Sequence, residues 1–306
     1  MSLWNHYLLP GSIDEALSAL RNAPGPACLV AGGTDLLLEL QQGHHSPVDT
    51  LVDISHIPEL ACLEVRGEAL FIGAAVPVAQ LAEAPVVRCH AEALAEACGL
   101  IGGPQVRNTA TLGGNVAHAL PAADGMIALV ALDAQAEIAS ASAGGLSLRL
   151  VPLLSLFRGP GQSALVPDRE ILVGFYLLKR QTGQASTFLR VMRPQGVALP
   201  ILNLAVWLAR AGDRIIDIRL AVGPAGPVPR RAVAVEDVLR GSVYTHEVLE
   251  QAQRTWQETV VFRSSPRRAS AEYRRYLSGV LLEEGLTRAW QRAAISSGEG
   301  DGDKCA

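Results

Sequence analysis

A glycine pair placed directly after a short apolar run constrains the fold of this chain more than any other feature. In CLVAGGTDLLLEL, residues 28–40, the run ends at Gly32-Gly33, and Thr34 and Asp35 then lead into three leucines. This order predicts a strand, a tight turn and a helix. Such a turn is a common anion-binding position, because backbone N–H groups point out of the start of a helix.

This first turn lacks the signatures of the two best-known phosphate-binding loops. It has no lysine in the P-loop position, and it lacks the three spaced glycines of the Rossmann fingerprint. An anion bound here would therefore be held by backbone N–H groups and by short polar side chains without a full positive charge.

A second glycine pair, Gly113-Gly114, lies roughly eighty residues later in TLGGN, residues 111–115. Glycine lets the backbone approach a ligand closely, and its N–H groups can converge on phosphate oxygens. Either pair alone could simply permit a tight turn. Together, with room for a separate subdomain between them, they favour a two-sided clamp around the diphosphate of a dinucleotide.

The rest of the chain alternates between helical and strand-like patterns. Ser12 and Glu15 form a capping box that predicts the start of a helix. The segment 101–124 is glycine-rich and without periodicity, which predicts a long functional loop. A Gly212-Asp213 turn predicts a hairpin. Strands are expected at 27–31 and 50–54, two strands within 62–74, a hairpin within 136–151, and β-rich stretches within 171–226. Helices are expected within 77–99 and at 125–133, 235–241, 246–260 and 269–294.

Composition excludes several classes of protein. With 306 residues the chain has room for two or three domains, and its net charge of -4 gives no reason to expect nucleic acid as a partner. No stretch is apolar enough for a transmembrane helix, and the N-terminus does not resemble a secretory signal, so we expect a cytoplasmic protein. The seven histidines are scattered and no G-x-S-x-G motif occurs, which argues against a metal site and a simple hydrolase.

The five cysteines show neither a C-x-x-C pair nor another metal-ligand spacing. This argues against an iron–sulfur or zinc site and favours buried free thiols in a reducing compartment. The run PRRASAEYRR, residues 266–275, is predicted as the first turn and solvated face of a helix capped by Ser270. An anion site or a docking surface is the alternative for this run.

These motifs resemble the flavin-binding subunit of the molybdenum hydroxylases. That family contains the flavin domain of xanthine dehydrogenase, the medium subunit of carbon monoxide dehydrogenase and the flavin subunit of 4-hydroxybenzoyl-CoA reductase. The resemblance covers most of the chain, and it is carried by AGGTDLL at 31–37, IGA at 72–74, RNTATLGGNVAHALPAAD at 107–124, FRGPGQSALVPDREIL at 157–172, FLRVMRP at 188–194 and SSPRRASAEYRRYL at 264–277.

The resemblance implies an α+β protein with the vanillyl-alcohol-oxidase or PCMH-type FAD-binding fold. Two α/β subdomains, 1–57 and 58–176, would bind FAD between them. A C-terminal α+β domain with an antiparallel sheet and helices would follow at 177–290, and 291–306 would form a disordered tail.

The resemblance also implies the residues that bind FAD in an extended conformation. One turn would wrap the diphosphate with Leu29, Val30, Ala31, Gly32, Gly33, Thr34, Asp35 and Leu36, and the other with Thr111, Leu112, Gly113, Gly114 and Asn115. Asp124 would accept a hydrogen bond near the adenosine or ribitol end, and Ile101 and Leu172 would make apolar contacts. Leu189 takes the position of a flavin-side lysine in xanthine dehydrogenases. No residue is assigned a catalytic or metal-binding role.

By the same resemblance, the chain is an FAD-containing electron-transfer subunit of an oxidoreductase. A small partner subunit with [2Fe-2S] clusters would supply electrons, and a large partner subunit would hold the molybdenum cofactor, in a dimer of heterotrimers. The acceptor would be NAD, a quinone or another compound. The alternatives are a self-contained flavin oxidase of the same fold and a non-catalytic nucleotide-binding scaffold.

Overall fold

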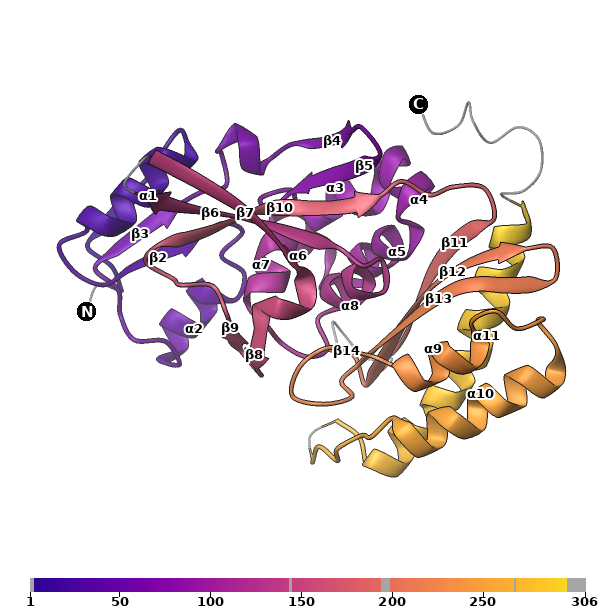
Figure 1. Cartoon of the computed structure of the whole chain (residues 1–306). Helices are drawn as coiled ribbons and strands as arrows, with labels where there is room; N and C mark the ends of the chain where they lie inside the picture. Colours follow the sequence, from indigo (N-terminus) through magenta and orange to yellow (C-terminus); the bar gives the residue numbers. More distant parts are fainter. Residues whose placement is uncertain (1–2, 143–144, 194–198, 267, 296–306) are drawn as a thin grey trace.

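The computed structural model describes residues 3–142, 145–193, 199–266 and 268–295. Two N-terminal lobes and a C-terminal domain follow one another along an elongated molecule (Figure 1). The expected α+β fold is confirmed, because mixed helices and sheets occur in all three parts. The domain boundaries at 57 and 176 stay predictions.

The first lobe is a parallel sheet with a helix on each face. Its strands lie in the order β1-β3-β2, so their carboxyl ends meet at one edge, where the first glycine turn lies. The Ser12 hydroxyl accepts a hydrogen bond from the Glu15 N–H, as predicted for the start of the first helix. The elements are β1 (His6–Leu8), α1 (Ile13–Asn22), β2 (Ala27–Val30), α2 (Leu36–Gln42) and β3 (Thr50–Asp53).

The second lobe is a five-stranded antiparallel sheet in the order β4-β5-β10-β6-β7. Its short helices pack on one face through a large apolar core, and α1 of the first lobe packs on the other. The strands are β4 (Leu63–Arg66), β5 (Ala69–Gly73), β6 (Gln135–Ser142), β7 (Gly145–Pro152) and β10 (Glu170–Leu178), with the separate ribbon β8 (Phe157–Gly159) and β9 (Gln162–Ser163). The helices are α3 (Val78–Glu83), α4 (Pro85–His90), α5 (Glu92–Leu100), α6 (Pro104–Thr109), α7 (Leu112–Ala117) and α8 (Asp124–Ala131).

The C-terminal domain is a four-stranded antiparallel sheet covered on both faces. Its own helices bury one face, whereas Phe188, Ala205 and Ala221 on the other face join the core of the second lobe under α5 and α8. The predicted hairpin at Gly212-Asp213 joins its second and third strands. The elements are β11 (Gln184–Val191), β12 (Leu202–Ala211), β13 (Arg214–Gly223), β14 (Arg230–Arg231), α9 (Val233–Leu239), α10 (His246–Thr259) and α11 (Ala271–Ile295).

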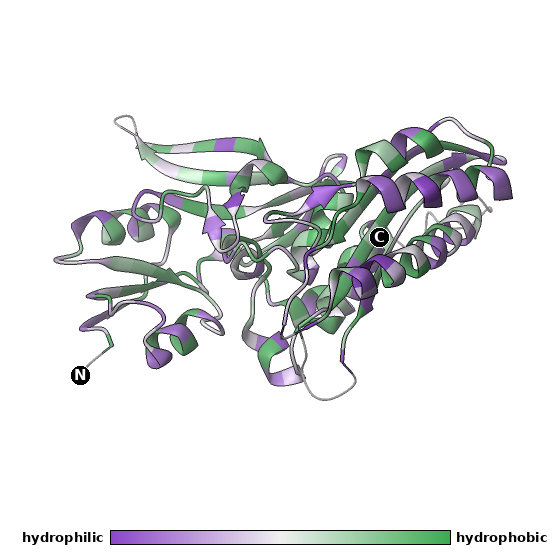
Figure 2. Cartoon of the chain, turned by 90° about the horizontal axis from the view of Figure 1, so that it is seen from below, coloured by the Kyte–Doolittle hydropathy of each residue, from purple (hydrophilic) through white to green (hydrophobic). Residues whose placement is uncertain are grey.

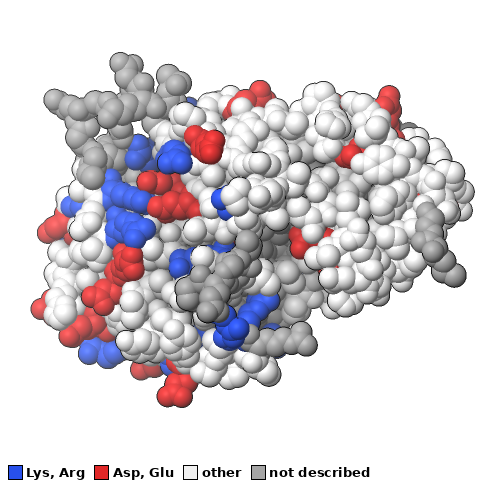
Figure 3. Space-filling view, turned by 180° about the vertical axis from the view of Figure 1, so that it is seen from behind, with Lys and Arg blue, Asp and Glu red and all other residues white. Residues whose placement is uncertain are grey.

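Hydropathy and charge follow this arrangement. Apolar residues line the strands and the helix faces that contact them, and the outer faces of the C-terminal helices are hydrophilic (Figure 2). Acidic and basic side chains gather side by side over the C-terminal half and are sparse over the N-terminal lobes on the face shown in Figure 3.

Three expectations from the sequence are wrong. The segment 101–124 is no long loop, because α6 and α7 lie within it. Helix α11 continues to Ile295, past the expected start of a disordered tail at 291. Cys28, Cys62 and Cys98 are free thiols as expected, but only Cys98 among them is buried, and Cys89 is disulfide-bonded. Residues 296–306, and Cys305 with them, lie outside the described residues.

No helix in the described ranges is both long and apolar enough to cross a membrane. The same residues contain no group of three or more histidine, cysteine, aspartate or glutamate side chains that could hold a metal ion. The cytoplasmic location stays a prediction.

Candidate dinucleotide site

The two glycine turns lie against each other between the first and second lobes. A Cβ atom added to Gly32 would lie 2.0 Å from the Thr109 carbonyl oxygen and 2.9 Å from the Ala110 Cα atom. No side chain other than hydrogen fits at that distance from backbone. Because Thr111 follows directly, the structure brings together the two turns that the sequence singled out.

The first turn offers a row of unused backbone donors. No acceptor among the described residues takes a hydrogen bond from the N–H groups of residues 32 to 36. Gly33 has a left-handed backbone with φ of 65°. Asp35 precedes α2, but its side chain caps none of the helix N–H groups. These N–H groups and the positive end of the α2 dipole suit an anion such as a diphosphate.

The second turn differs from the expectation, because its N–H groups already have partners. The N–H groups of Leu112 and Gly113 donate to the carbonyls of Val76 (3.2 Å) and Ala74 (2.8 Å), and the Gly114 N–H donates to the Thr111 hydroxyl (3.1 Å). Unlike the first turn, α7 therefore has no unused amides at these three positions.

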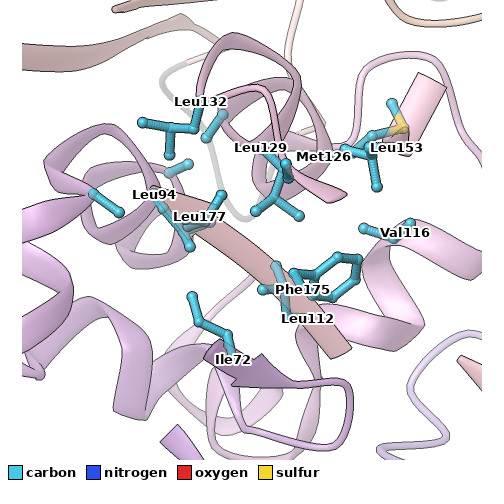
Figure 4. Packing of buried hydrophobic residues seen from close by; sticks show 14 of the residues in the cluster. Ile72, Leu94, Leu112, Val116, Met126, Leu129, Leu132, Leu153, Phe175 and Leu177 are labelled. Atoms are coloured by element: carbon cyan, nitrogen blue, oxygen red, sulfur yellow. The ribbon is translucent and has the colours of Figure 1, made fainter. Parts of the chain in front are cut away.

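Helix α7 instead presents one face to the core and one outward. Leu112 and Val116 point from α7 towards Phe175 of β10 (Figure 4). Gly114 is exposed on the opposite face. The half-buried Asn115 accepts a hydrogen bond from the Met126 N–H through its side-chain oxygen. At the second turn, a ligand would meet the bare backbone of Gly114 and the Asn115 amide group.

His118 also lies in this region, although it was not among the residues predicted to bind FAD. Its Nε2 atom lies 3.7 Å from Glu39 Oε1 on α2, so it links the helices that follow the two glycine turns. His118 lies four residues after Gly114 and thus on the same outward side of the chain. This helical spacing is the feature of the sequence from which its position could have been predicted.

Comparison with known proteins decides the family. Residues 3–177 match the family described as the FAD binding domain in molybdopterin dehydrogenase, and residues 187–289 match the CO dehydrogenase flavoprotein C-terminal domain. The chain belongs to the FAD-binding subunits of the molybdopterin dehydrogenases. It is therefore an FAD-binding subunit of an oxidoreductase, in agreement with the resemblance seen in the sequence.

Two relatives and a solved structure illustrate the family. The chain is 32% identical over 287 residues to the putative xanthine dehydrogenase FAD-binding subunit of Escherichia coli K12, covering 92% of this chain and 95% of the relative. It is also 32% identical to the nicotine 6-hydroxylase medium subunit of Paenarthrobacter nicotinovorans, covering 94% and 97%. The structure of carbon monoxide dehydrogenase from Hydrogenophaga pseudoflava matches with a TM-score of 0.86 at 28% identity, covering 94% of this chain and 98% of that chain.

The first turn fits FAD better than the second, because only the first has unused N–H groups. Most side chains of the predicted set face the interior. Val30 is buried in the core around α2, and Leu36 packs against it. Leu29 and Ala31 pack on the opposite face of the first sheet. In this stretch the backbone, and the side chains of Thr34 and Asp35, remain for a ligand.

Asp124 lies in a buried contact between the second lobe and the C-terminal domain. One of its carboxylate oxygens accepts from Arg190 Nη1 at 2.5 Å and the other from Asn203 Nδ2 at 2.7 Å. The same Arg190 atom donates to the Leu100 carbonyl at 2.6 Å, next to Ile101. Burial raises the pKa of Asp124 to about 6, although the positive charge of Arg190 opposes this shift. Its predicted contact with FAD stays a prediction, since both oxygens already have donors.

The side chains of two other predicted residues face apolar cores. Leu172 on β10 is buried in the core of the second lobe. Leu189 points away from the two N-terminal lobes, because it packs with the C-terminal helices. Its Cδ1 atom lies 3.5 Å from a Cβ atom built on Gly285 of α11. The adjacent Arg190 faces the second lobe instead, as the alternation of side chains along a strand requires. The positive charge on this side therefore belongs to Arg190.

Replacing Asp124 by asparagine should remove one contribution to the pH dependence of the free energy of unfolding. The folded-state pKa of about 6 exceeds the ordinary 3.8, so the stabilisation from this group is complete below pH 4 and is lost as the pH rises through 6. Asp124→Asn cannot titrate. The free energy of unfolding of the variant relative to wild type should therefore increase by roughly 2–3 kcal/mol between pH 4 and pH 7. Urea unfolding at several pH values measures this difference, and a pH-independent difference would contradict the assignment.

Proposed function

We propose that the chain binds FAD in an extended conformation between its two N-terminal lobes and serves as an electron-transfer subunit. The observation that carries this proposal is the contact of Gly32 with the backbone of Thr109 and Ala110, beside the unused N–H groups of residues 32 to 36. Bound FAD would supply chemistry that accepts electrons singly and releases them singly or in pairs.

The proposed role of each turn follows from its hydrogen bonds. The N–H groups of residues 32 to 36 would bind the diphosphate, and the exposed Gly114 backbone would allow close approach from the other side. Thr111 supports this approach indirectly, because its hydroxyl caps α7. Ile101, Leu172 and Asp124 would lie along the remainder of the cofactor, as the family resemblance implies.

The partners proposed for this chain come from the names of its relatives. Nicotine 6-hydroxylase and carbon monoxide dehydrogenase are represented by a medium subunit and a medium chain, which belong to multi-subunit enzymes. We propose a small [2Fe-2S] subunit as electron donor and a large subunit with the molybdenum cofactor, in a dimer of heterotrimers. Since the described residues hold no metal-binding cluster, the clusters would belong to the partner. NAD or a quinone would be the acceptor.

Purification of the chain from its native cells tests the proposal. We expect a yellow protein with about one FAD per chain, identified by chromatography after acid release, together with a large and a small subunit that contain molybdenum and iron. A yellow protein that oxidises a substrate alone would favour a self-contained flavin oxidase. A colourless protein that does not take up added FAD would contradict FAD binding altogether.

A further inference from the structure

Among the described residues, four arginines surround the start of α11, and none of them has an acidic partner there. Arg263 and Arg268 precede the helix, and Arg274 and Arg275 lie in its first two turns. In the described part of the chain, none of the four has a carboxylate oxygen within 4.0 Å. Glu272 is the one acidic residue between positions 263 and 275. This segment is therefore strongly positive in a chain whose net charge is -4.

Arginines elsewhere on the same helix behave differently. Arg288 pairs with Glu284 at 2.6 Å, and Arg292 pairs with Glu92 at 3.2 Å and Glu96 at 2.6 Å. The absence of such pairs at the start of α11 is thus a local feature.

Arg274 is buried, with 4% of its surface exposed. Its Nη1 atom donates to the Arg263 carbonyl at 2.6 Å, but its Nε atom has no partner among the described residues. Burial and the nearby charges of Arg268 and Arg263 lower the pKa of Arg274. A buried guanidinium without a counter-charge is costly, and an anion beside it would reduce that cost.

The surrounding backbone also favours an anion. The Ser264 hydroxyl accepts from the Ala271 N–H at 2.9 Å, and the Ser270 hydroxyl accepts from the Tyr273 N–H at 3.1 Å, which confirms the predicted cap. Both hydroxyls keep their own proton for donation. The positive end of the 25-residue helix dipole lies at the same place.

We propose that Arg263, Arg268, Arg274 and the Ser264 hydroxyl form a binding site for an oxyanion of the phosphate type. This site, the Arg274 site, lies on the segment that joins α10 to α11 (Figure 1). Guanidinium groups from three positions suit a tetrahedral anion with several oxygens better than a planar carboxylate with two. Inorganic phosphate and a phosphorylated metabolite both fit the site, since both present the same group.

Thermal unfolding of the flavin-loaded chain tests the Arg274 site. Inorganic phosphate should raise the unfolding midpoint in a saturable way, and chloride or acetate at equal ionic strength should not. FAD occupies the diphosphate site during this measurement, so added phosphate cannot act there. Glycerol phosphate, a phosphate monoester, distinguishes the two sources. It should bind as tightly as inorganic phosphate if the phosphate group alone is recognised, and more tightly than inorganic phosphate if the ligand is a phosphorylated metabolite.

The variants separate binding from folding. The double variant Arg263→Gln/Arg268→Gln changes exposed side chains and should weaken phosphate binding about tenfold or more, with flavin content unchanged. Arg274→Met should abolish the response, and Arg288→Gln, on the same helix, should keep it. If Arg274→Met does not fold, the double variant still decides. A wild-type chain without a phosphate-specific shift, or a double variant with the full shift, would overturn the proposal.

Discussion

Gly32→Ala is expected to empty the flavin site. The new Cβ atom would lie 2.0 Å from the Thr109 carbonyl oxygen, so the two glycine turns would have to separate. Overpacking of this kind costs about 1–3 kcal/mol or more, which corresponds to a weakening of FAD binding of roughly fivefold or greater. The ratio of flavin to protein absorbance after purification, and titration of the apoprotein with FAD, measure the effect.

Gly99→Ala is the matched control, because its Cβ atom would meet its nearest neighbour, the Ala82 Cβ atom, at an ordinary 3.8 Å. Gly114→Val addresses the ligand side, since Gly114 is exposed and a Cβ atom there would come close only to the Thr111 hydroxyl, at 3.2 Å. This variant should lose flavin while its apoprotein keeps a near-normal unfolding midpoint. Normal flavin content in both Gly32→Ala and Gly114→Val would contradict the proposed position of the diphosphate.

Arg190→Met is expected to destabilise the fold strongly. It removes the donor that serves both the Asp124 carboxylate and the Leu100 carbonyl at the boundary between the second lobe and the C-terminal domain. Removing one partner of a buried pair costs about 3–5 kcal/mol, because the remaining charge stays buried. Urea unfolding at pH 8, where Asp124 is ionised, measures the loss.

The exposed pair between Arg288 and Glu284 on α11 supplies the control for this measurement. Arg288→Met should cost less than about 1 kcal/mol. A loss in Arg190→Met no larger than in Arg288→Met would show that the Arg190 contact contributes little to stability.

Sequence patterns predicted those helix caps and turns that depend only on neighbouring residues. The Ser12 cap and the Gly212 hairpin depend on residues within a few positions of each other, and both are observed. Helices α6 and α7 were missed because each has only six residues, and isolated helices of that length are unstable. Their signals were Pro104 at the first position of α6 and the Thr111 cap of α7.

The candidate site likewise has a part that local sequence patterns predicted and a part that depends on distant residues. The glycine pairs pointed to both turns, because glycine is required where backbone approaches backbone. The partners of the α7 amides could not be predicted, since Ala74 and Val76 lie far earlier in the chain and the IGA segment at 72–74 gave no indication of this pairing. At positions 189 and 190, a shift of one residue along a strand exchanges the two faces, so the sequence alone could not show which side chain faces the second lobe.

The apolar patch of Phe188, Ala205 and Ala221 makes the C-terminal domain dependent on its neighbour. Expressed alone, residues 187–289 would expose to water the sheet face that α5 and α8 normally cover. Such a fragment should aggregate, whereas a chimera that retains the second lobe together with this sheet should remain folded. The part of the chain that can be exchanged between related enzymes without unfolding is therefore larger than either of the two segments that match a family, 3–177 and 187–289.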